Sequence, residues 1–181
     1  RTNSVYNWSV YHKSTGAGGI MILQSTSAFV TASTSWNNTA PTSSVFSVAT
    51  DNGTNASAQN MIAYCFAAIP GFSAFGSYTG NGSTDGPFVY TGFLPKFILW
   101  KNASGGTASW AIHDTSRSPY NTTITTLSPN TSAVDGSVGE IIDMLSNGFK
   151  IRSTDAWQNT SGSTYIYAAF AENPFKNSNA R

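Results

Sequence analysis

Charged residues are scarce in this chain. Asp, Glu, Lys and Arg make up only 9% of the 181 residues, against roughly 25% in soluble domains generally. Ser, Thr, Asn and Gly supply the polar surface instead, which is typical of exported proteins and of virus particles and not of cytosolic enzymes. A chain of this length can bury a sizeable core, so we expect one large domain or two small ones that pack closely.

A run of basic residues is also missing. The formal net charge is +1 and no cluster of Lys or Arg occurs in the chain, so the sequence offers no surface for a phosphate backbone or an anionic membrane. The longest apolar stretch, from Met61 to Pro70, is interrupted by Tyr64 and is too short to cross a bilayer. We therefore expect neither nucleic acid nor a membrane as a partner.

The single cysteine excludes an internal disulfide. Cys65 stands between Tyr64 and Phe66 in the apolar stretch, and such aromatic neighbours are typical of a buried strand. We expect Cys65 to be a small buried hydrophobic residue and not a reactive thiol.

Convincing helical periodicity is absent, whereas alternation with period two is frequent. Apolar residues alternate in this way at Trp8 with Val10, Phe46 with Val48, Trp110 with Ile112, and Phe149 with Ile151. Clusters of Gly, Asn, Asp, Ser and Thr separate these segments and favour turns. Residues 139–147 fit a short strand better than a helix, because a glycine follows them directly. The pattern predicts an all-β protein built as an antiparallel β-sandwich.

Several segments recur in the same order at a spacing of roughly 100 residues. The matching pairs are residues 8–12 with 110–114, residues 44–48 with 147–151, and residues 62–67 with 166–171. The sequence thus predicts two related repeats, residues 1–75 and residues 76–181, that pack closely. Residues 86–100 look like two strands joined by a turn, and the first repeat has no counterpart to them. We expect the first repeat to be N-terminally incomplete, either because the chain was cut from a longer array or because a neighbouring chain supplies the missing strands.

Residues suited to catalysis are few. A glycosidase needs two carboxylates that face each other across a cleft, yet most acids here stand in turn-forming contexts, and only Glu140 and Asp143 are close in sequence. Positions three apart on a strand point to opposite faces, so this pair does not converge. His12 and His113 lie in no arrangement suited to nucleophilic or metal chemistry, and we expect loop or strand-end positions for both. We predict no catalytic residue and no enzyme.

A structural calcium ion is the one cofactor for which ligands are present. Asp51, Asp85 and Asp135 each precede a glycine by one or two residues, but none has the spacing of a calcium-binding loop. We expect no metal site and no cofactor, with a structural Ca²⁺ ion as the open alternative.

Aromatic side chains offer the only candidate binding site. Sugars stack on exposed aromatic rings beside Asn, Asp and Gly, and the chain holds 5 Trp and 8 Tyr. Three tryptophans lie in alternating apolar segments and are expected in the core: Trp8, Trp100 and Trp110. Four aromatic residues lie among polar turn residues, and with one acid they form the predicted ligand-binding set: Trp36, Trp157, Tyr78, Tyr120 and Asp85.

Longer motifs carry a resemblance to a known family. These are Gly-Ser-Tyr-Thr-Gly-Asn-Gly-Ser at residues 76–83, Gly-Phe-Leu-Pro-Lys-Phe at 92–97, Leu-Ser-Asn-Gly-Phe-Lys-Ile at 145–151, and Tyr-Ile-Tyr-Ala-Ala-Phe-Ala-Glu-Asn-Pro-Phe at 165–175. Together with residues 8–12 and 36–46, they resemble a repeated domain of marine and cyanobacterial bacteriophage virion proteins. That domain is often described as tail-fibre-like and is similar to concanavalin A-like or laminin-G-like sandwiches.

The resemblance implies a fold and a role. It implies a concanavalin A-like jelly roll in a non-catalytic structural protein on the virion surface, in a tail fibre, an appendage or the capsid. The implied partners are other virion proteins, further copies of the chain in a homo-oligomer, and a host-surface glycan as receptor. The family pattern supplies no catalytic residue. The alternatives are a carbohydrate-binding, lectin-like module of a secreted or cell-surface protein and, third, a secreted glycosidase, against which the lack of a convergent carboxylate pair counts.

Overall fold

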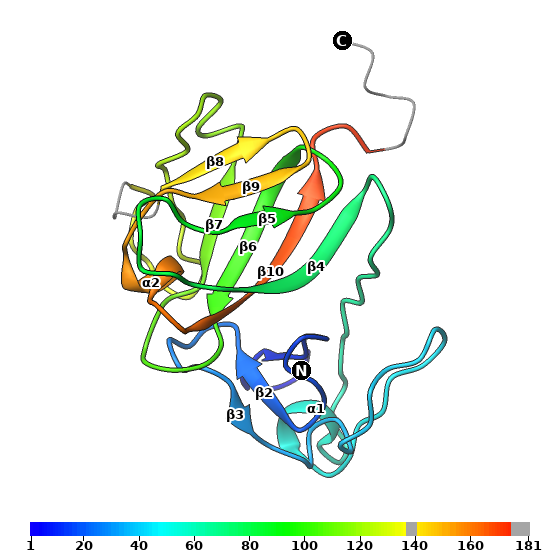
Figure 1. The fold of residues 1–181 in the computed structure, drawn as a ribbon. Helices are drawn as coiled ribbons and strands as arrows, with labels where there is room; N and C mark the ends of the chain where they lie inside the picture. Colours follow the sequence, from blue (N-terminus) through cyan, green and yellow to red (C-terminus); the bar gives the residue numbers. More distant parts are fainter. Residues whose placement is uncertain (137–140, 175–181) are drawn as a thin grey trace.

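The protein is all-β, with antiparallel sheets and two very short helices in the part of the chain that the structure describes. The computed structural model describes residues 1–136 and 141–174. Two sheets form a sandwich and a third, small sheet lies at the N-terminal end, as Figure 1 shows. The all-β prediction from period-two alternation is therefore confirmed.

A four-stranded sheet forms one layer of the sandwich. Its strand order is β4 (Ser73–Thr79), β10 (Thr164–Ala171), β6 (Pro95–Asn102) and β7 (Ala111–Asp114). Strand β10 lies at its centre and pairs antiparallel with both β4 and β6. Every backbone amide along β10 therefore has a strand on one side or the other.

A three-stranded sheet forms the opposite layer. Its strand order is β5 (Phe88–Tyr90), β9 (Gly148–Ile151) and β8 (Ile142–Leu145). The two strands predicted within residues 86–100 are thus β5 and the first part of β6, and they lie in different sheets. The predicted strand at residues 139–147 is β8, although residues 139 and 140 lie outside the described part.

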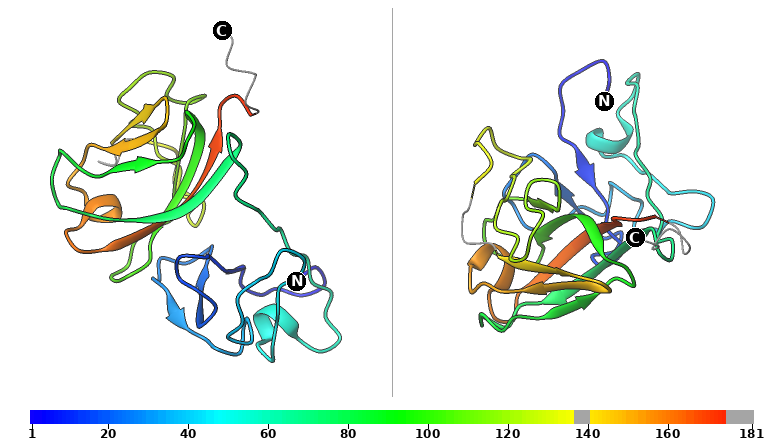
Figure 2. Two further views of the ribbon diagram at one scale, coloured as in Figure 1. Left: turned by 45° about the vertical axis from the view of Figure 1, so that its right-hand side comes forward. Right: turned by 90° about the horizontal axis from the view of Figure 1, so that it is seen from above.

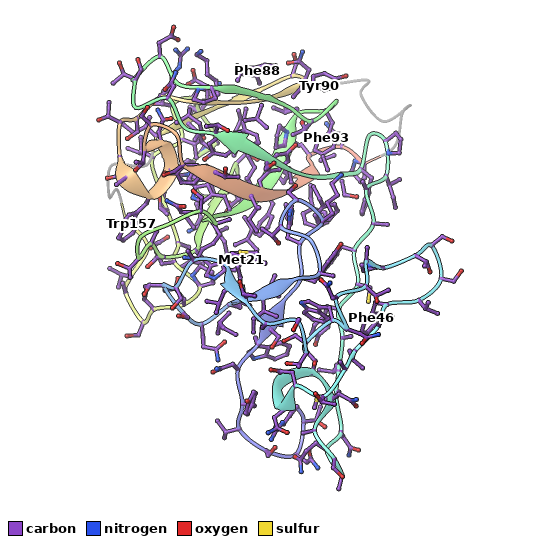
Figure 3. All side chains as sticks on the ribbon, turned by 60° about the horizontal axis from the view of Figure 1, so that its bottom comes forward. Met21, Phe46, Phe88, Tyr90, Phe93 and Trp157 are labelled. Atoms are coloured by element: carbon purple, nitrogen blue, oxygen red, sulfur yellow. The ribbon has the colours of Figure 1, made fainter. Side chains whose placement is uncertain are left out.

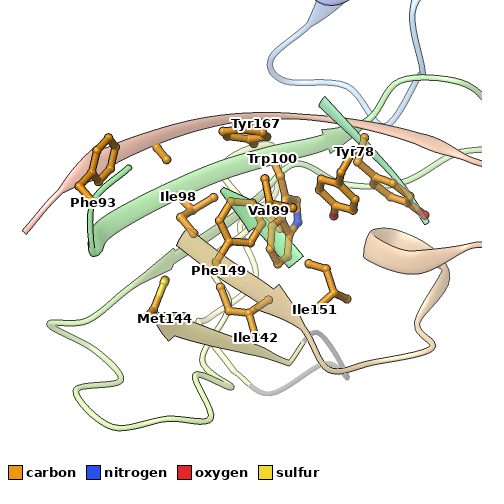
Figure 4. Packing of buried hydrophobic residues seen from close by; sticks show 13 residues of the cluster. Tyr78, Val89, Phe93, Ile98, Trp100, Ile142, Met144, Phe149, Ile151 and Tyr167 are labelled. Carbon is orange, nitrogen blue, oxygen red and sulfur yellow. The ribbon is translucent and has the colours of Figure 1, made fainter. Parts of the chain in front are cut away.

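The inward faces of the two sheets share one apolar core, seen in Figure 4. Its members are Tyr78, Val89, Phe93, Ile98, Trp100, Ala111, Ile142, Met144, Phe149, Ile151, Tyr165, Tyr167 and Ala169. Phe149 meets Tyr167 edge to face at 5.4 Å, and Tyr78 stacks on Tyr165 at 5.1 Å. Burying one such aromatic ring contributes about 2 kcal/mol, so these contacts are a main source of the attraction between the two sheets.

The N-terminal part packs against the outer face of the four-stranded sheet. It contains β1 (Ser9–Val10), β2 (Gly19–Ile22), β3 (Val30–Thr31) and the helix α1 (Asn52–Asn55). Met21 on β2 is fully buried against Trp110, Ala103 and Ile166 of the sandwich. The left view of Figure 2 shows the N-terminal part as a separate lobe below the sandwich. This contact joins the N-terminal part to the sandwich, and the division into two related repeats stays a prediction.

One buried lysine joins the two parts. The Lys101 ammonium is fully enclosed and donates hydrogen bonds to the carbonyl oxygens of Thr26, at 2.8 Å, and of Ala108. Burial lowers the pKa of Lys101 to about 8. The backbone pair Phe29 N to Ala103 O, at 3.2 Å, lies beside it.

Several sequence expectations fail in the N-terminal part. Residues 44–48 and 62–67 form no strand, and Trp8 is 46% exposed instead of lying in the core. Cys65 is exposed and not a buried hydrophobic residue. These residues alternate like strand residues, but in this structure no strand pairs with them along their length. By contrast, Trp100 and Trp110 are in the core as predicted.

The helices are single turns. Besides α1, the described residues contain α2 (Ala156–Asn159), which closes the sandwich next to β10. In the described residues, no helix is both long and apolar enough to cross a membrane.

Candidate functional site

A groove of about 430 Å³ opens at one end of the sandwich. It lies where β6 begins, β7 ends and the chain leaves β10, and the connection after β7 forms one wall. The residues that line it are Leu94, Lys96, Thr115, Ser118, Pro119, Tyr120, Asn121, Thr123, Met144 and Glu172. Tyr120 belongs to the predicted binding set and is 83% exposed.

A tight turn directs the chain from β7 into this wall. The Asp114 carboxylate accepts hydrogen bonds from the backbone N–H groups of Ser116 and Arg117, at 3.0 and 2.9 Å, and from Arg117 Nε at 2.6 Å. Partial burial would raise the pKa of Asp114, but these hydrogen bonds and the Arg117 charge lower it overall. The carboxylate thus stays charged and fixes the turn.

Asn121 fixes the other side of Tyr120. Its amide group pairs with the backbone of Met144 on β8, donating from Nδ2 to the carbonyl oxygen and accepting from the amide N–H, both at 2.8 Å. This side chain imitates the two hydrogen bonds of a neighbouring strand. Tyr120 is therefore an exposed ring on a backbone that is anchored at both ends, so little conformational entropy is lost when a ligand stacks on it.

The polar groups of the groove are varied and mostly neutral. Lys96 Nζ lies 3.8 Å from a Glu172 carboxylate oxygen, and both side chains are about one-third exposed or more. The hydroxyl groups of Thr115 and Thr123 are buried and have no hydrogen-bond partner in the structure. Buried hydroxyls are usually paired, so two unpaired hydroxyls in residues that line the groove are unusual. An aromatic ring beside hydroxyls and one ion pair suits a sugar.

A second, smaller groove of about 280 Å³ carries another predicted residue. Trp157 on α2 lines it together with Asn102, Gly105, Gly106, Thr107, Ala108, Ala156, Thr160 and Ser163. Figure 3 shows Trp157 at the edge of the molecule. The Tyr165 hydroxyl donates to Ala156 O at 2.8 Å and accepts from Thr160 N at 2.9 Å. These bonds hold α2, and with it Trp157, on the sheet.

The predicted binding set is not one site. Tyr120 and Trp157 line different grooves, and Trp36 is half-buried in the N-terminal part, where its Nε1 donates to Gly19 O at 3.1 Å. Tyr78 is wrong as a binding residue, because only 8% of it is exposed and its hydroxyl donates to Gln158 O at 2.9 Å. Burial raises the pKa of Tyr78 well above its usual value.

Asp85 is exposed but forms ion pairs with two basic side chains. Its carboxylate lies 2.8 Å from Lys150 Nζ and 3.9 Å from Arg152 Nη1. The hydrogen bond and charge of Lys150 lower the pKa of Asp85. This acid therefore belongs to a surface ion pair and to neither groove.

Sequence reasoning missed Lys96, Glu172 and the two threonines. Glu172 stands 76 positions after Lys96 and 49 positions after Thr123, and no local motif links the four residues. The strand-end positions of Lys96 and Glu172, each next to an apolar strand, are the one signal in the sequence that could have placed them at the sandwich's end.

Neither histidine lines a groove: His12 lies in the loop after β1, as expected, and His113 is the next-to-last residue of β7. His113 stands within β7 and is fully buried, whereas His12 is 8% exposed. His12 accepts from Ser14 N at 3.1 Å, and its other ring nitrogen lies 3.1 Å from Tyr167 O. Burial lowers the pKa of both rings, that of His113 to about 3. In the described residues, no group of three or more His, Cys, Asp or Glu is placed to hold a metal ion.

Comparison with known proteins gives a family but no activity. A family model described as a domain of unknown function, DUF7483, matches residues 1–174. The chain belongs to this family. The matched region of the DUF7483 model includes both the N-terminal part and the sandwich. No curated protein and no solved structure matches the chain.

Proposed function

We propose that this DUF7483 chain is a non-catalytic structural module of a bacteriophage particle, on a tail fibre, an appendage or the capsid surface, and that its Tyr120 groove contacts a host-surface glycan. The proposal includes a concanavalin A-like jelly roll with two related repeats. It rests on the low charge, on the two packed antiparallel sheets and on the motifs at residues 76–83 and 165–175.

The exposure of Tyr120 is the observation that carries the glycan contact. The Tyr120 ring is 83% exposed, and the backbone that carries it is anchored through Asn121 on one side and the Asp114 turn on the other. A rigid ring with one polar end is a favourable platform for a partly apolar, partly polar ligand. Carbohydrates present both kinds of surface.

The carboxylates of the groove favour binding over catalysis. Retaining and inverting glycosidases both use two carboxyl groups across the scissile bond. Within the described residues, Glu172 is the only acid that lines the Tyr120 groove, and it faces Lys96. We therefore propose a site that holds a sugar without cleaving it.

Composition and packing support the proposed structural role. Few charges and many neutral hydrogen bonds suit a scaffold outside the cell, where other virion proteins and further copies of the chain are the proposed neighbours. A lectin-like module of a secreted or cell-surface protein is the alternative, and it would use the same groove. Immunogold labelling of purified phage particles separates the two, because only a virion component labels the particle.

The glycan contact is tested with the purified chain on a glycan array and on host cells. We expect saturable binding that Tyr120→Ala weakens by about 30-fold, as for a central aromatic contact residue. Tyr90→Ala is the matched control, since Tyr90 is also exposed, at 67%, but lies on β5 outside both grooves. Trp157→Ala tests the second groove in the same assay.

Two outcomes would refute the proposed site. Equal loss of binding in the Tyr120 and Tyr90 variants would show that the groove is not the contact. Release of reducing sugar from a bound glycan would show that the chain is an enzyme. Absence of binding to every glycan and host tested would leave only the scaffold part of the proposal.

A further inference from the structure

Two corners of the chain, 104 residues apart, are built in the same way. In the first, the Asp51 side chain accepts from Gly53 N at 2.6 Å and its carbonyl accepts from Asn55 N at 2.8 Å. In the second, the Asp155 side chain accepts from Trp157 N at 2.7 Å and its carbonyl accepts from Asn159 N at 2.8 Å. Each corner is a single helical turn capped by an aspartate.

The agreement extends beyond the helical turn. Asn55 donates from Nδ2 to Ala49 O at 2.6 Å, and the residue 104 positions later, Asn159, donates to Ser153 O at 2.8 Å. Ala58 has a φ of 57° and the equivalent Gly162 a φ of 79°. Residues other than glycine rarely adopt this left-handed conformation, so its recurrence at equivalent positions indicates a shared chain path.

The two corners lead into different surroundings. The second leads into β10, which begins when Thr164 O accepts from Ala103 N at 2.9 Å and Thr164 N donates to Ser104 Oγ at 2.7 Å. The first leads to Asn60, whose carbonyl accepts from Thr2 N at 3.0 Å and whose N–H donates to Asn3 Oδ1 at 3.2 Å.

These contacts show which residues of the N-terminal part are equivalent to the end of β6 and the start of β10. Asn60 corresponds to Thr164, and Thr2 occupies the place of Ala103, the residue that directly follows β6. Along β10 the next residues pair with β6 on one side and β4 on the other. Residues 61–67 have no such neighbour and form no strand, although their first contact is the one that starts β10.

Side chains at equivalent positions are buried in β10 and exposed in residues 61–67. Ile166 on β10 is 2% exposed, whereas Ile62 is 47% exposed. Ala169 is fully buried, and its equivalent Cys65 is exposed. Residues 61–69 contain no charged side chain. The exposed large side chains of this segment are Met61, Ile62, Tyr64, Phe66 and Ile69, an apolar patch that soluble proteins normally cover.

Residues 44–48 show the same contrast. Phe46 is 43% exposed and Val48 is 36% exposed, while Phe149 and Ile151 of β9, 103 residues later, are fully buried. In the sandwich, Phe149 is covered by Tyr78 of β4 and lies on a strand that pairs with β5. What the N-terminal part lacks is thus a set of strands equivalent to β4, β5 and β6.

We propose that residues 1–72 are a strand acceptor, and that the occupant is a three-strand polypeptide segment with the pattern of residues 73–102. Its β6-like strand would end directly before Thr2, and its β4-like strand would pair with the opposite edge of residues 61–67. Backbone hydrogen bonds would supply affinity, and the apolar residues of both segments would build a second sandwich core.

Two observations favour this occupant over others. The acceptor already touches the complete sandwich, because the Phe66 ring lies 5.7 Å from Phe170 and 6.4 Å from Phe75, so the new strands would extend an existing contact. A second folded copy cannot supply them, since its own β4 and β6 are paired along their length with β10. Releasing them would cost most of that copy's core.

Cys65 reports occupancy directly, because the chain has a single cysteine. In the full chain alone, we expect Cys65 to react with 5,5′-dithiobis(2-nitrobenzoate) within about tenfold of the rate for the urea-unfolded chain. A fusion that places an extra copy of residues 73–101 directly before Arg1 supplies the strands in register. There we expect the reaction to slow by at least about 100-fold, as for a thiol exposed only by local opening.

The matched control is the same fusion with Ile98→Asp and Trp100→Asp in the added copy alone, which should react as fast as the unfused chain. If Cys65 is already protected in the unfused monomer, or if a soluble, folded fusion gives no protection beyond the control, the proposal is wrong. Protection in the unfused chain that appears only on dimerisation would assign the surface to a second copy and would also overturn it.

A pair of equivalent isoleucines tests the acceptor without any fusion. Ile62→Asp should leave the urea midpoint of the full chain unchanged, because Ile62 contributes to no core in the absence of the occupant. Ile166→Asp, at the equivalent position in β10, should lower the midpoint strongly or prevent folding. A large loss of stability from Ile62→Asp would show that residues 61–67 are buried by their own chain, contrary to the proposal.

Discussion

The buried histidine of β7 should make the fold sensitive to mild acid. His113 is fully buried, its ring centre lies 4.7 Å from that of Trp100, and Nε2 lies 3.1 Å from Thr126 Oγ1. The other ring nitrogen has no hydrogen-bond partner in the structure. Burial, with the nearby Arg117 charge, lowers the pKa of His113 to about 3, and Asp114 only partly opposes this.

The sign of the effect follows from proton linkage. The unfolded chain binds a proton at this residue below a pH of about 6.5, while the folded chain does not do so until a pH of about 3. Acidification therefore favours the unfolded state across this interval. Between pH 6.5 and pH 5, where few carboxyl groups titrate, His113 alone should reduce the free energy of unfolding by about 1.5 kcal/mol.

Urea unfolding at pH 6.5, 6.0, 5.5 and 5.0, followed by tryptophan fluorescence, measures this loss. The His113→Phe variant keeps an aromatic ring beside Trp100 but cannot titrate, so its stability should fall by about 1.5 kcal/mol less over the same interval. His12→Gln is the control for the other histidine, whose lowered pKa acts in the same direction. Identical pH dependence in the wild-type and His113→Phe proteins would refute the reasoning, as would an NMR titration of the His113 ring near pH 6.5.

Three further predictions concern single residues. Burial lowers the pKa of Lys101 in the folded chain to about 8, so the unfolded chain keeps this proton to higher pH. Urea unfolding should therefore show a free energy of unfolding that rises by about 1.5 kcal/mol from pH 8 to 9.5, and Lys101→Met should remove this rise. A Cβ at Gly148 would lie 2.1 Å from Val89 O, so Gly148→Ala should lower the free energy of unfolding by about 2 kcal/mol or more. The control is Gly105→Ala, which has open space around it and should change this free energy by less than about 0.5 kcal/mol. Asn159→Ala removes a fully buried amide that bonds Asn81, Ser83 and Ser153 and should cost about 3 kcal/mol in the same assay, against about 1 kcal/mol at most for the exposed Asn55→Ala.

Local alternation predicted the sandwich well where neighbouring strands exist. Trp110 with Ile112 and Phe149 with Ile151 indicated β7 and β9, and the residues expected in the core there, such as Trp110 and Phe149, are buried. The same alternation at Phe46 and at residues 62–67 predicted strands that the structure lacks. Alternation shows which side chains favour burial, but it holds no information on whether a partner strand is present to bury them.

The candidate site was only partly predictable. Tyr120 was found because it stands among polar turn residues, and it is exposed. Tyr78 has equally polar neighbours in the sequence, yet it faces inward, because β4 pairs with β10 and sets Tyr78 opposite Tyr165. The facing of a residue in a sheet is decided by register with a distant strand, which the neighbours of that residue in the sequence do not reveal.

Neutral amide side chains hold several loops of this protein in place, which is consistent with its low content of charged residues. Asn121 pairs with the backbone of β8, and Asn159 joins the segments after β4 and β9, tasks that ion pairs perform in many soluble proteins. Hydrogen bonds between neutral groups are not weakened by dissolved salt as exposed ion pairs are. Where amides and not ion pairs hold the loops, the surface should change little with ionic strength, and a role outside the cell, as proposed above, would benefit from this.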